Sequence, residues 1–392
     1  MIRIAPSICI MRNLLGAAAL LLVTANSLGE HQTDSQAAAK GANGRKRSEG
    51  VVEVGEIKGV PFRIDVPEGW SGGLVMYCRS CGGPSRYGIP GALAGFPGGQ
   101  LAAFLQRGFA VAQSGFSEPC WPLDEGIHET EALRRYFVQK YGVPKEVYVT
   151  GHSSGGLLAM ALVETFPDVY DGGLSLGGIN APMAWILERR EFDSLVVFDY
   201  YFPGVLPPLD KIPVEYNLSA DRIHKLLKEH PEHAETLRRF SGLRTNEDLA
   251  KAFSFYPASL ANIQRRAHGN PCDNRNTIYS GTSDDNAVND RVKRYAANPT
   301  AVEYLRRCYT PTGVLKKPLL SMHCTYDLYV PGWVMNAYST IHRQAGGPDF
   351  FVQQYVKRDG HCVFTVEEVG LGFDQLRQWR LKGVRPAAGM LK

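Results

Sequence analysis

The sequence lacks a strong excess of either charge, a long hydrophobic run and any evident internal repeat. Its 392 residues carry a formal net charge of +4 that is spread along the chain, so the charge indicates neither a nucleic-acid surface nor an electrostatic funnel for acidic substrates. The apolar stretch from Leu14 to Ala25 is shorter than the roughly 20 residues of a membrane-spanning helix. With 44% hydrophobic and 21% charged residues, the composition is that of a globular protein rather than a disordered or fibrous one.

Residues 1–28 have the pattern of a signal peptide. Arg12 supplies a basic flank, and Val23-Thr24-Ala25 offers the small residues that a signal peptidase needs. Residues 29–50 are rich in Ala, Gly, Gln, Ser and Lys without periodicity, which predicts a flexible leader. We therefore expect a secreted or periplasmic protein with no stable membrane association after cleavage. An uncleaved membrane anchor is the alternative, because hydropathy does not separate the two cleanly.

Seven of the eight cysteines follow the predicted signal peptide, and export makes disulfides plausible for them. They are Cys78, Cys81, Cys120, Cys272, Cys308, Cys324 and Cys362. The odd number leaves at least one thiol unpaired in a monomer. Cys78 and Cys81 form a C-x-x-C, but no second such motif exists and the segment opens no thioredoxin-like helix, so redox or zinc chemistry is weakly indicated.

Strand and helix patterns alternate in the first part of the chain, over residues 51–185. The predicted strands are 51–57, 60–66, 73–77, 109–112, 146–150 and 173–176, and the predicted helices are 100–106, 131–141 and 156–166. Lys58-Gly59 is a hairpin signal between the first two strands. Strands separated by crossover helices predict a mostly parallel sheet flanked by helices, here opened by an antiparallel hairpin.

The alternation stops near Trp185 and returns near Gly313. Residues 186–312 contain helical stretches broken by Pro203-Gly204 and Pro207-Pro208. Strands are then predicted at 318–322 and 350–356, a helix at 334–344, and a last helix from Thr365, which opens with capping-box spacing. The pattern predicts one α/β domain, 51–185 and 313–385, with a helical cap inserted at 186–312 between strands 6 and 7.

The most specific motif is Gly151-His152-Ser153-Ser154-Gly155, directly after a predicted strand and directly before an apolar helix. This is a G-x-S-x-G nucleophile elbow, whose tight turn needs small residues two before and two after the serine. The turn presents the hydroxyl of Ser153 above the sheet, and the helix that follows points its positive end toward developing negative charge. An ordinary glycine-rich turn with an exposed serine is the alternative.

A serine hydroxyl needs a histidine base and an acid behind it, and the elbow predicts them later in the chain in the order Asp, then His. Asp327 follows the strand 318–322, and His361 follows the next strand in Asp359-Gly360-His361. Both therefore lie at carboxyl ends of strands, the edge where an open parallel sheet carries its functional loops. We predict Ser153, Asp327 and His361 as a catalytic triad.

These three segments resemble the α/β-hydrolase superfamily, especially its esterase, feruloyl-esterase-like and prolyl-oligopeptidase-like branches. The resemblance rests on the elbow, on the H-x-T-x-D-x-x-V-P segment from His323 to Pro331 and on the D-G-H segment, and it covers the predicted α/β domain but not the insertion. It implies an α/β-hydrolase fold and a serine hydrolase. The chain departs from it at Cys324, where such families often have glycine.

Several other residues compete for the same roles. Asp359 is a rival acid, but it stands only two residues from the base. His152 is expected to pack in the elbow and His323 to play a structural part. Asp284 and Asp285 offer a metal site or an acid, although such a cluster is more often a turn.

The oxyanion hole needs two backbone N–H groups, and Ser154 supplies the first by its position after the nucleophile. The resemblance implies a second donor in the loop after the third strand, where aligning a His-Gly-X pattern places Cys81 at X. Arg79 is a candidate substrate contact or a solvated arginine. At the start of the insertion, Trp185, Tyr201 and Phe202 are candidates for lining a substrate pocket, and the core of the cap is the alternative.

The cysteines suggest three pairings. Cys324 and Cys362 flank the acid and base loops and would pin them together; two reduced thiols are the alternative. Cys120 is expected to pair with Cys78 or Cys81. Cys272 would pair with Cys308.

The sequence thus predicts a secreted serine hydrolase that cleaves a carboxylic ester through an acyl-enzyme. It needs no cofactor and no metal, and it acts on a small-molecule ester without nucleic acid. A prolyl-oligopeptidase-like peptidase is an alternative, although the chain has no room for the large propeller such enzymes usually carry. A catalytically inactive hydrolase fold used for binding is another. The acyl and alcohol groups and the oligomeric state are not indicated.

Overall fold

The computed structural model describes residues 50–81, 99–118 and 120–392. The predicted signal peptide and all but the last residue of the predicted leader lie outside the described residues.

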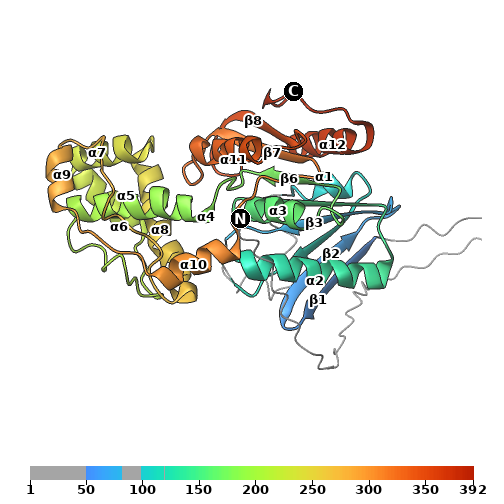
Figure 1. Ribbon diagram of the computed structural model, residues 1–392, viewed down its shortest axis with the longest axis horizontal. Coiled ribbons are helices and arrows are strands. Elements are labelled where there is room, and N and C mark those ends of the chain that lie inside the picture. Colours follow the sequence, from blue (N-terminus) through green and yellow to red (C-terminus); the bar gives the residue numbers. More distant parts are fainter. Residues whose placement is uncertain (1–49, 82–98, 119) are drawn as a thin grey trace, which may run out of the picture. The chain divides into compact units, whose positions relative to one another are not determined.

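A nine-stranded sheet forms the centre of the fold, in the order β1-β2-β4-β3-β5-β6-β7-β8-β9 (Figure 1). The pairs β1–β2 and β2–β4 are antiparallel, and every other pair is parallel. The strands are β1 Val51–Ile57, β2 Val60–Val66, β3 Gly73–Cys78, β4 Ala110–Ser114, β5 Glu146–His152, β6 Gly172–Leu176, β7 Leu319–Tyr326, β8 Phe351–Asp359 and β9 Gly389–Met390. The eight strands predicted from the sequence are confirmed, and within residues 50–81, 99–118 and 120–392 the two-residue β9 is the one additional strand.

Helices cover both faces of this sheet. They are α1 Ala102–Leu105, α2 Leu123–Tyr141, α3 Ser154–Thr165, α11 Gly332–Ala345 and α12 Val366–Lys382. Along β3, Leu74 and Met76 pack in the hydrophobic core beneath α2 and α3, whereas Val75 and Tyr77 pack in the core beneath α1 and α12. This alternation is the two-residue period of a strand buried on both sides. The predicted helix 100–106 is shorter than expected, but α12 begins with the predicted capping box at Thr365.

The segment between β6 and β7 is helical, as predicted, and its helices gather beside the sheet in Figure 1. Its elements are α4 Met183–Trp185, the π-helical segment η2 Ile186–Phe192, α5 Asp193–Tyr201, α6 Ala220–Glu229, α7 Pro231–Ser241, α8 Asn246–Ala267, α9 Asp285–Arg291 and α10 Pro299–Cys308. We call this segment the cap. Hydrogen bonds fasten it to the rest of the fold: the indole of Trp121 donates to Ser259 in α8 at 2.7 Å, and Arg266 donates to the carbonyl of Trp121 at 2.6 Å.

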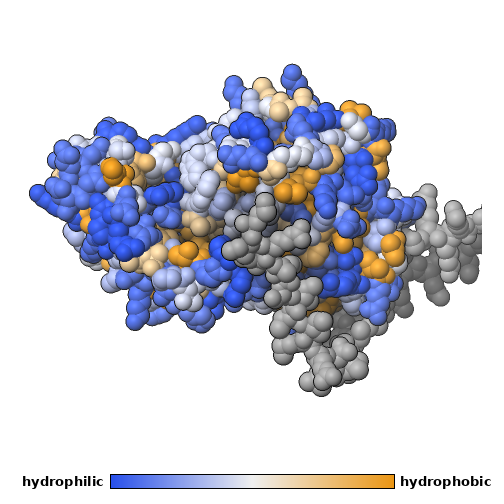
Figure 2. Space-filling model, in the orientation of Figure 1, coloured by the Kyte–Doolittle hydropathy of each residue, from blue (hydrophilic) through white to orange (hydrophobic). Residues whose placement is uncertain are grey.

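The visible surface of the described part is mostly hydrophilic, with hydrophobic residues scattered singly or in small groups (Figure 2). Among the described residues, no helix combines the length and the apolar character needed to cross a bilayer.

Candidate active site

Ser153 occupies a sharp turn between β5 and α3. Its backbone lies at φ 56° and ψ −122°, a conformation that non-glycine residues rarely adopt outside functional sites. A Cβ on Gly151 would lie 2.3 Å from the carbonyl O of Gly155, and one on Gly155 would lie 2.1 Å from the carbonyl O of Cys78. Glycine is therefore sterically required at both flanks, which explains the motif recognised in the sequence.

The helix that follows, α3, is almost entirely buried. Ten of its twelve residues are buried, from Ser154 to Val163, and its N-terminal turn begins directly behind Ser153. The first N–H groups of a helix have no partner within it, and the aligned peptide dipoles leave that end positive. The backbone of Ser154 is thus placed to donate to an anion beside Ser153.

Asp327 and His361 are in hydrogen-bond contact. Nδ1 of His361 lies 2.6 Å from Oδ2 of Asp327. The other carboxylate oxygen, Oδ1, accepts the backbone N–H groups of Tyr329 at 2.8 Å and of Val330 at 3.0 Å. Both oxygens of the acid are therefore engaged, so the carboxylate is held in one orientation and the proton on His361 is directed to Nδ1.

Two further side chains hold the loop that carries the acid. His323 bonds through Nε2 to the carbonyl O of Val330 at 2.9 Å, which agrees with the structural part expected for it. Arg190, on η2 of the cap, donates through Nη2 to the carbonyl O of Leu328 at 2.6 Å. Because Leu328 directly follows Asp327, the cap helps to fix the position of the acid.

The surroundings shift the pKa values of both groups. Burial alone would raise the pKa of Asp327, but the charge and hydrogen bond of His361, with His323 and the N–H of Val330, lower it below its usual value. Burial alone would lower the pKa of His361, but the contacts with Cys362 and Asp327 raise it well above its usual value. The pair thus favours a carboxylate beside an imidazolium, the state that a base reaches after taking a proton.

Cys362 contacts the other nitrogen of the base, its Sγ lying 3.5 Å from Nε2 of His361. The same thiol is 3.6 Å from the carbonyl O of Leu176. Among the described residues no hydrogen bond joins Ser153 to His361, a bond that in unliganded enzymes often tightens only when substrate arrives. In the described structure the thiol of Cys362 is thus the partner of Nε2.

The rival residues are placed elsewhere. Asp359 is exposed and pairs with Arg244 of the cap at 2.7 Å, so it does not orient the base. His152 is buried against Tyr77, whose hydroxyl lies 3.0 Å from its Nδ1, and burial lowers its pKa to about 3. Asp284 caps α9, and Asp285 accepts from Thr282 in the adjoining turn, which is the structural role that the sequence allowed.

The loop after β3 carries the second expected oxyanion donor. Cys81 forms a disulfide with Cys120, which selects one of the two partners predicted for Cys120. The sulfur of Cys81 lies 3.8 Å from Oγ of Ser154, so the two residues expected to donate to the oxyanion are neighbours.

Arg79 is neither a solvated side chain nor an open substrate contact. It is buried at 2% exposure and donates to the carbonyl groups of Gly115, Ser80 and Glu118 at 2.8–2.9 Å. These bonds tie the loop after β3 to the loop after β4, on which Cys120 stands. Arg79 therefore supports the position of Cys81.

The other expected bridges do not form. Cys324 and Cys362 are free thiols: the sulfur of Cys324 points to the carbonyl O of Val363 at 3.7 Å, whereas that of Cys362 points to His361. The prediction of a 324–362 bridge is therefore wrong in this structure, because the thiols face different neighbours. Cys272 and Cys308 are also free.

The structure has two described pockets beside the acid loop. Of the three residues predicted to line a pocket, Trp185 lines one of these, and the other two residues line neither. It lies with Glu188, Arg189 and Trp333 around a pocket of about 390 Å³. Tyr201 bonds to Ser283, and the ring of Phe202 packs on those of Phe198, His230 and His233 within the cap. Both side chains therefore make their contacts within the cap, which is the alternative that the sequence left open for them.

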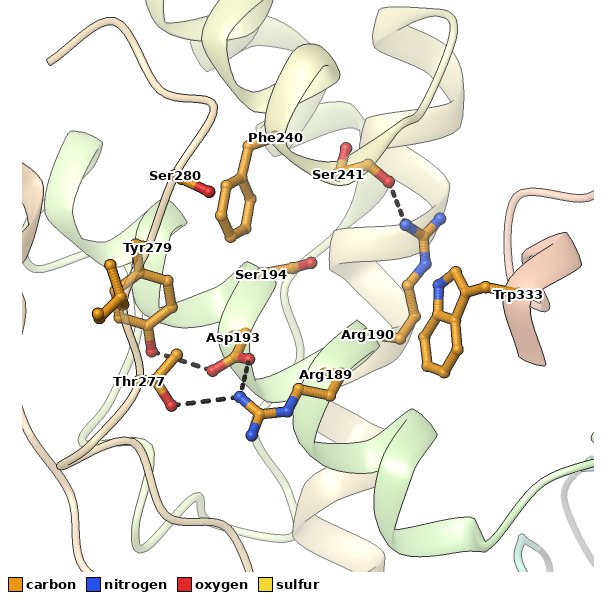
Figure 3. A pocket seen from close by; sticks show the side chains of 11 residues that line it. Arg189, Arg190, Asp193, Ser194, Phe240, Ser241, Thr277, Tyr279, Ser280 and Trp333 are labelled. Carbon is orange, nitrogen blue, oxygen red and sulfur yellow. Dashed lines mark hydrogen bonds and ion pairs between the residues drawn. The ribbon is translucent and has the colours of Figure 1, made fainter. Parts of the chain in front are cut away.

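A neighbouring pocket of about 280 Å³ shares Arg189 and Trp333 (Figure 3). No triad residue lines either pocket. Sequence reasoning missed Arg190 and Trp333. Trp333 stands two residues after the Pro331 of the acid segment, a position that was available as a signal. Arg190 gave no signal, because its partners are backbone carbonyls from distant segments.

Comparisons with known proteins give local similarity to two hydrolases. The chain is 30% identical over 141 residues to an o-phthalyl amidase of Xanthobacter agilis, covering 34% of this chain and 28% of that protein. It is 31% identical over 121 residues to an acetylxylan esterase of Coprinopsis cinerea, covering 27% of this chain and 31% of that protein. The chain thus matches less than a third of the length of each of these relatives. No family model matches.

Among solved structures, Est1E from Butyrivibrio proteoclasticus is similar with a TM-score of 0.41 and 13% identity, covering 85% of this chain and 98% of that one. The assignment rests instead on the fold and its landmarks. An antiparallel β1–β2–β4 edge continues into a parallel sheet, the serine elbow follows β5, and the acid and the histidine follow β7 and β8 in that order. The chain therefore has the α/β-hydrolase fold, a mostly parallel sheet flanked by helices.

Proposed function

We propose that this protein is a serine hydrolase that cleaves a carboxylic ester, with Ser153 as nucleophile, His361 as base and Asp327 as the acid that orients it. The observation that carries the proposal is the 2.6 Å contact between His361 and Asp327 on the sheet whose elbow carries Ser153. The similarity to an acetylxylan esterase supports the choice of an ester.

In the proposed reaction, Oγ of Ser153 attacks the carbonyl carbon while Nε2 of His361 takes its proton. The backbone N–H groups of Ser154 and Cys81 donate to the alkoxide that forms on the carbonyl oxygen. Collapse of this intermediate breaks the ester bond, and His361 protonates the departing alcohol. Water then repeats the sequence on the acyl-Ser153 ester, releasing the acid and the free serine. No step requires a cofactor or a metal.

Two features support export as part of this proposal. The sequence opens with a signal-peptide pattern, and the disulfide between Cys81 and Cys120 is typical of oxidising compartments.

A second candidate reaction is cleavage of an amide, favoured by the similarity to an o-phthalyl amidase. The same triad would serve, with an amine as leaving group. Rates on a matched ester and anilide with one acyl group distinguish the two: we expect the ester to react at least a hundredfold faster, and a higher kcat/KM on the anilide would favour the amidase.

Substitutions test the triad. Ser153→Ala and His361→Ala should each lower turnover of 4-nitrophenyl acetate by several orders of magnitude, and the double variant should be scarcely worse than either, because triad members act as a unit. Asp327→Asn should be severe through loss of the correct histidine tautomer, whereas Asp359→Asn is a matched control that removes only the ion pair with Arg244. Full additivity of the first two changes, or the reverse order of the two aspartates, would contradict the assignment. Labelling of wild type but not Ser153→Ala by a fluorophosphonate probe identifies the nucleophile directly.

A further inference from the structure

The two pockets described above adjoin each other where the cap meets the acid loop. They share Arg189, on η2, and Trp333, in the first turn of α11. Arg190, which lines the smaller pocket, donates to the carbonyl of Leu328 beside the acid. A molecule bound there would contact residues one hydrogen bond away from the loop that positions the triad.

Two large indole rings stand at this opening. Trp185 is 48% exposed and Trp333 is 43% exposed, and both line the larger pocket. Exposed large apolar side chains around a cavity are typical of ligand sites, because the rings gain from being covered. A flat aromatic face suits a ligand that offers a flat array of C–H groups, which the negative face of the ring attracts.

The charges in the pocket wall are already matched. Arg189 lies 3.4 Å from both Glu188 and Asp193. The guanidinium of Arg190 is directed to the carbonyls of Ser241 and Leu328. Burial raises the pKa values of Glu188 and Asp193. Arg189 thus faces both acids and Arg190 faces carbonyl oxygens, so an anionic ligand would have to compete with existing partners for either cation. The balance favours a neutral ligand.

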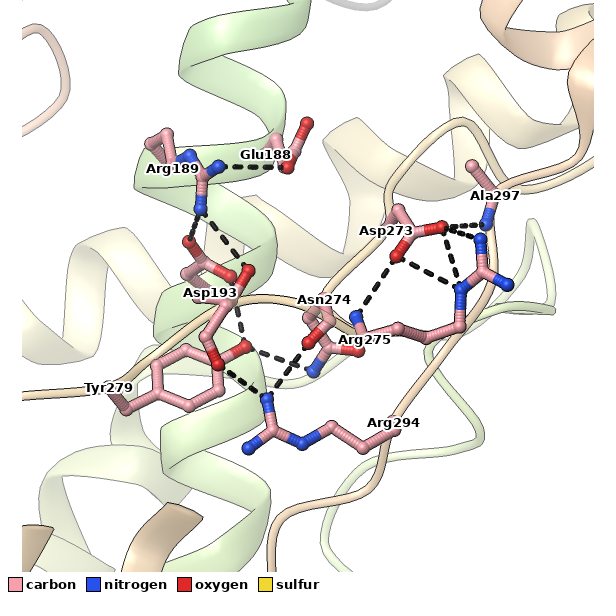
Figure 4. A network of polar contacts seen from close by, with 10 residues as sticks. Glu188, Arg189, Asp193, Asp273, Asn274, Arg275, Tyr279, Arg294 and Ala297 are labelled. Atoms are coloured by element: carbon pink, nitrogen blue, oxygen red, sulfur yellow. Dashed lines mark hydrogen bonds and ion pairs between the residues drawn. The ribbon is translucent and has the colours of Figure 1, made fainter.

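The rest of the smaller pocket offers hydroxyl groups on a fixed scaffold. Its lining includes Ser194, Ser241, Thr277 and Ser280. The segment that carries two of them is held by a network (Figure 4): Arg294 donates to the carbonyls of Asn274 at 2.9 Å and of Thr277 at 2.7 Å, and the amide of Asn274 donates to the hydroxyl of Tyr279 at 2.9 Å. Tyr279 in turn donates to the buried Asp193 at 3.0 Å. The backbone that carries Thr277 and Ser280 is therefore held in place before a ligand arrives.

We propose that this double pocket is a carbohydrate subsite, in which the face of a neutral pyranose packs on Trp185 and Trp333 and its hydroxyl groups bond to the polar wall. The inference rests on the proposed function and deepens it: the substrate is an ester of a neutral sugar, and this subsite holds the sugar portion. It explains together why exposed indoles, matched charges and fixed hydroxyl groups meet at one place beside the acid loop.

Hydrolysis of matched esters tests the subsite. The probes are a monoacetylated methyl xyloside, with free hydroxyl groups, and cyclohexyl acetate, which has the same ring size without them. Trp185→Ala and Trp333→Ala should each lower kcat/KM for the sugar acetate about tenfold, mainly through KM, as expected for loss of one stacking face. Their effect on cyclohexyl acetate should be under about threefold. Tyr355→Ala, a 40% exposed aromatic residue of β8 that lines neither pocket, is the matched control and should change neither rate.

Binding without hydrolysis separates this inference from the proposed reaction. In Ser153→Ala, unesterified xylotriose should change the intrinsic tryptophan fluorescence with saturation, and Trp333→Phe should retain more of the affinity than Trp333→Ala. Unaltered melting temperatures would exclude a folding defect. Equal losses on both acetates, no saturable change with xylotriose, or preference for the anionic monomethyl phthalate would each overturn the carbohydrate assignment. If only the triad variants gave unexpected rates, the binding of xylotriose would still support the subsite.

Discussion

At the scale of single residues, the thiol of Cys362 contacts Nε2 of His361 at 3.5 Å, the nitrogen that takes the proton in the proposed reaction. In the proposed reaction, His361 must be neutral to take a proton from Ser153, so kcat/KM should rise with pH through the pKa of His361. Cys362 and Asp327 raise that pKa, which moves the rise to higher pH.

Replacement of Cys362 by alanine should therefore shift the acidic limb of the rate profile to lower pH. Activity at pH 6 relative to pH 8 should increase, because one group that favours the imidazolium has been removed. The measurement is kcat/KM for 4-nitrophenyl acetate from pH 5 to 9. Cys324→Ala, which removes a thiol directed at Val363, serves as control. An acidic limb that stays in place or moves upward in Cys362→Ala would show that the contact does not tune the base.

At the scale of elements, η2 carries the buried Glu191. This residue directly follows Arg190, whose guanidinium holds the loop of Asp327. Burial raises the pKa of Glu191 from 4.5 to about 8, and a hydrogen bond with Ser259 only partly offsets this. The folded state thus binds the proton more tightly than the unfolded state. The free energy of unfolding that this protonated carboxyl group contributes is fully present below about pH 4.5. It is lost as the pH rises toward 8.

Glu191→Gln keeps the shape and the hydrogen bond without the ionisation. The variant should match wild type near pH 5 and exceed its unfolding free energy by roughly 2–4 kcal/mol at pH 8. Urea unfolding at the two pH values measures this difference. Glu235→Gln, an exposed position on α7, should leave the pH dependence unchanged. A Glu191→Gln variant that loses stability with pH as steeply as wild type would assign the effect to other groups.

The elements also show what the sequence could predict. Hydrophobic periodicity predicted the strands, and the two glycines that flank Ser153 predicted its sharp turn, because these are local patterns. The pairing of Cys81 rather than Cys78 with Cys120 depends on how two loops approach each other, and the burial of Arg79 depends on three carbonyls from the same two loops. Such contacts arise only from the assembled fold. The cap aromatics Tyr201 and Phe202 line neither described pocket for the same reason: their neighbours come from α5, from His230 and α7, and from the segment before α9.

At the scale of the whole molecule, the bridge between Cys81 and Cys120 joins two loops at the candidate oxyanion site across a sequence separation of 39 residues. Closing a loop of this length stabilises a fold by roughly 3–4 kcal/mol on the chain-entropy model.

A Cys81→Ser/Cys120→Ser variant should melt several degrees lower and hydrolyse esters more slowly, because one oxyanion donor loses its support. Peptide mapping without reduction should find the 81–120 linked peptide and free thiols at Cys324 and Cys362. Alkylation of Cys81 and Cys120 in the unreduced native protein would contradict the bridge. Cys272→Ser provides a control for loss of a buried thiol outside the site.

The insertion of the cap between β6 and β7 has a consequence for the order of folding. The elbow lies on β5 and needs only the first part of the chain, whereas the pairing of β6 with β7 must close a loop that contains the entire cap. Contacts so distant in sequence form slowly, because chain entropy is lost before they are gained. Asp327 and His361 both lie beyond that closure. During synthesis the growing chain therefore completes the elbow of Ser153 early and the segments of Asp327 and His361 last, so the proposed triad assembles only when the C-terminal strands have docked.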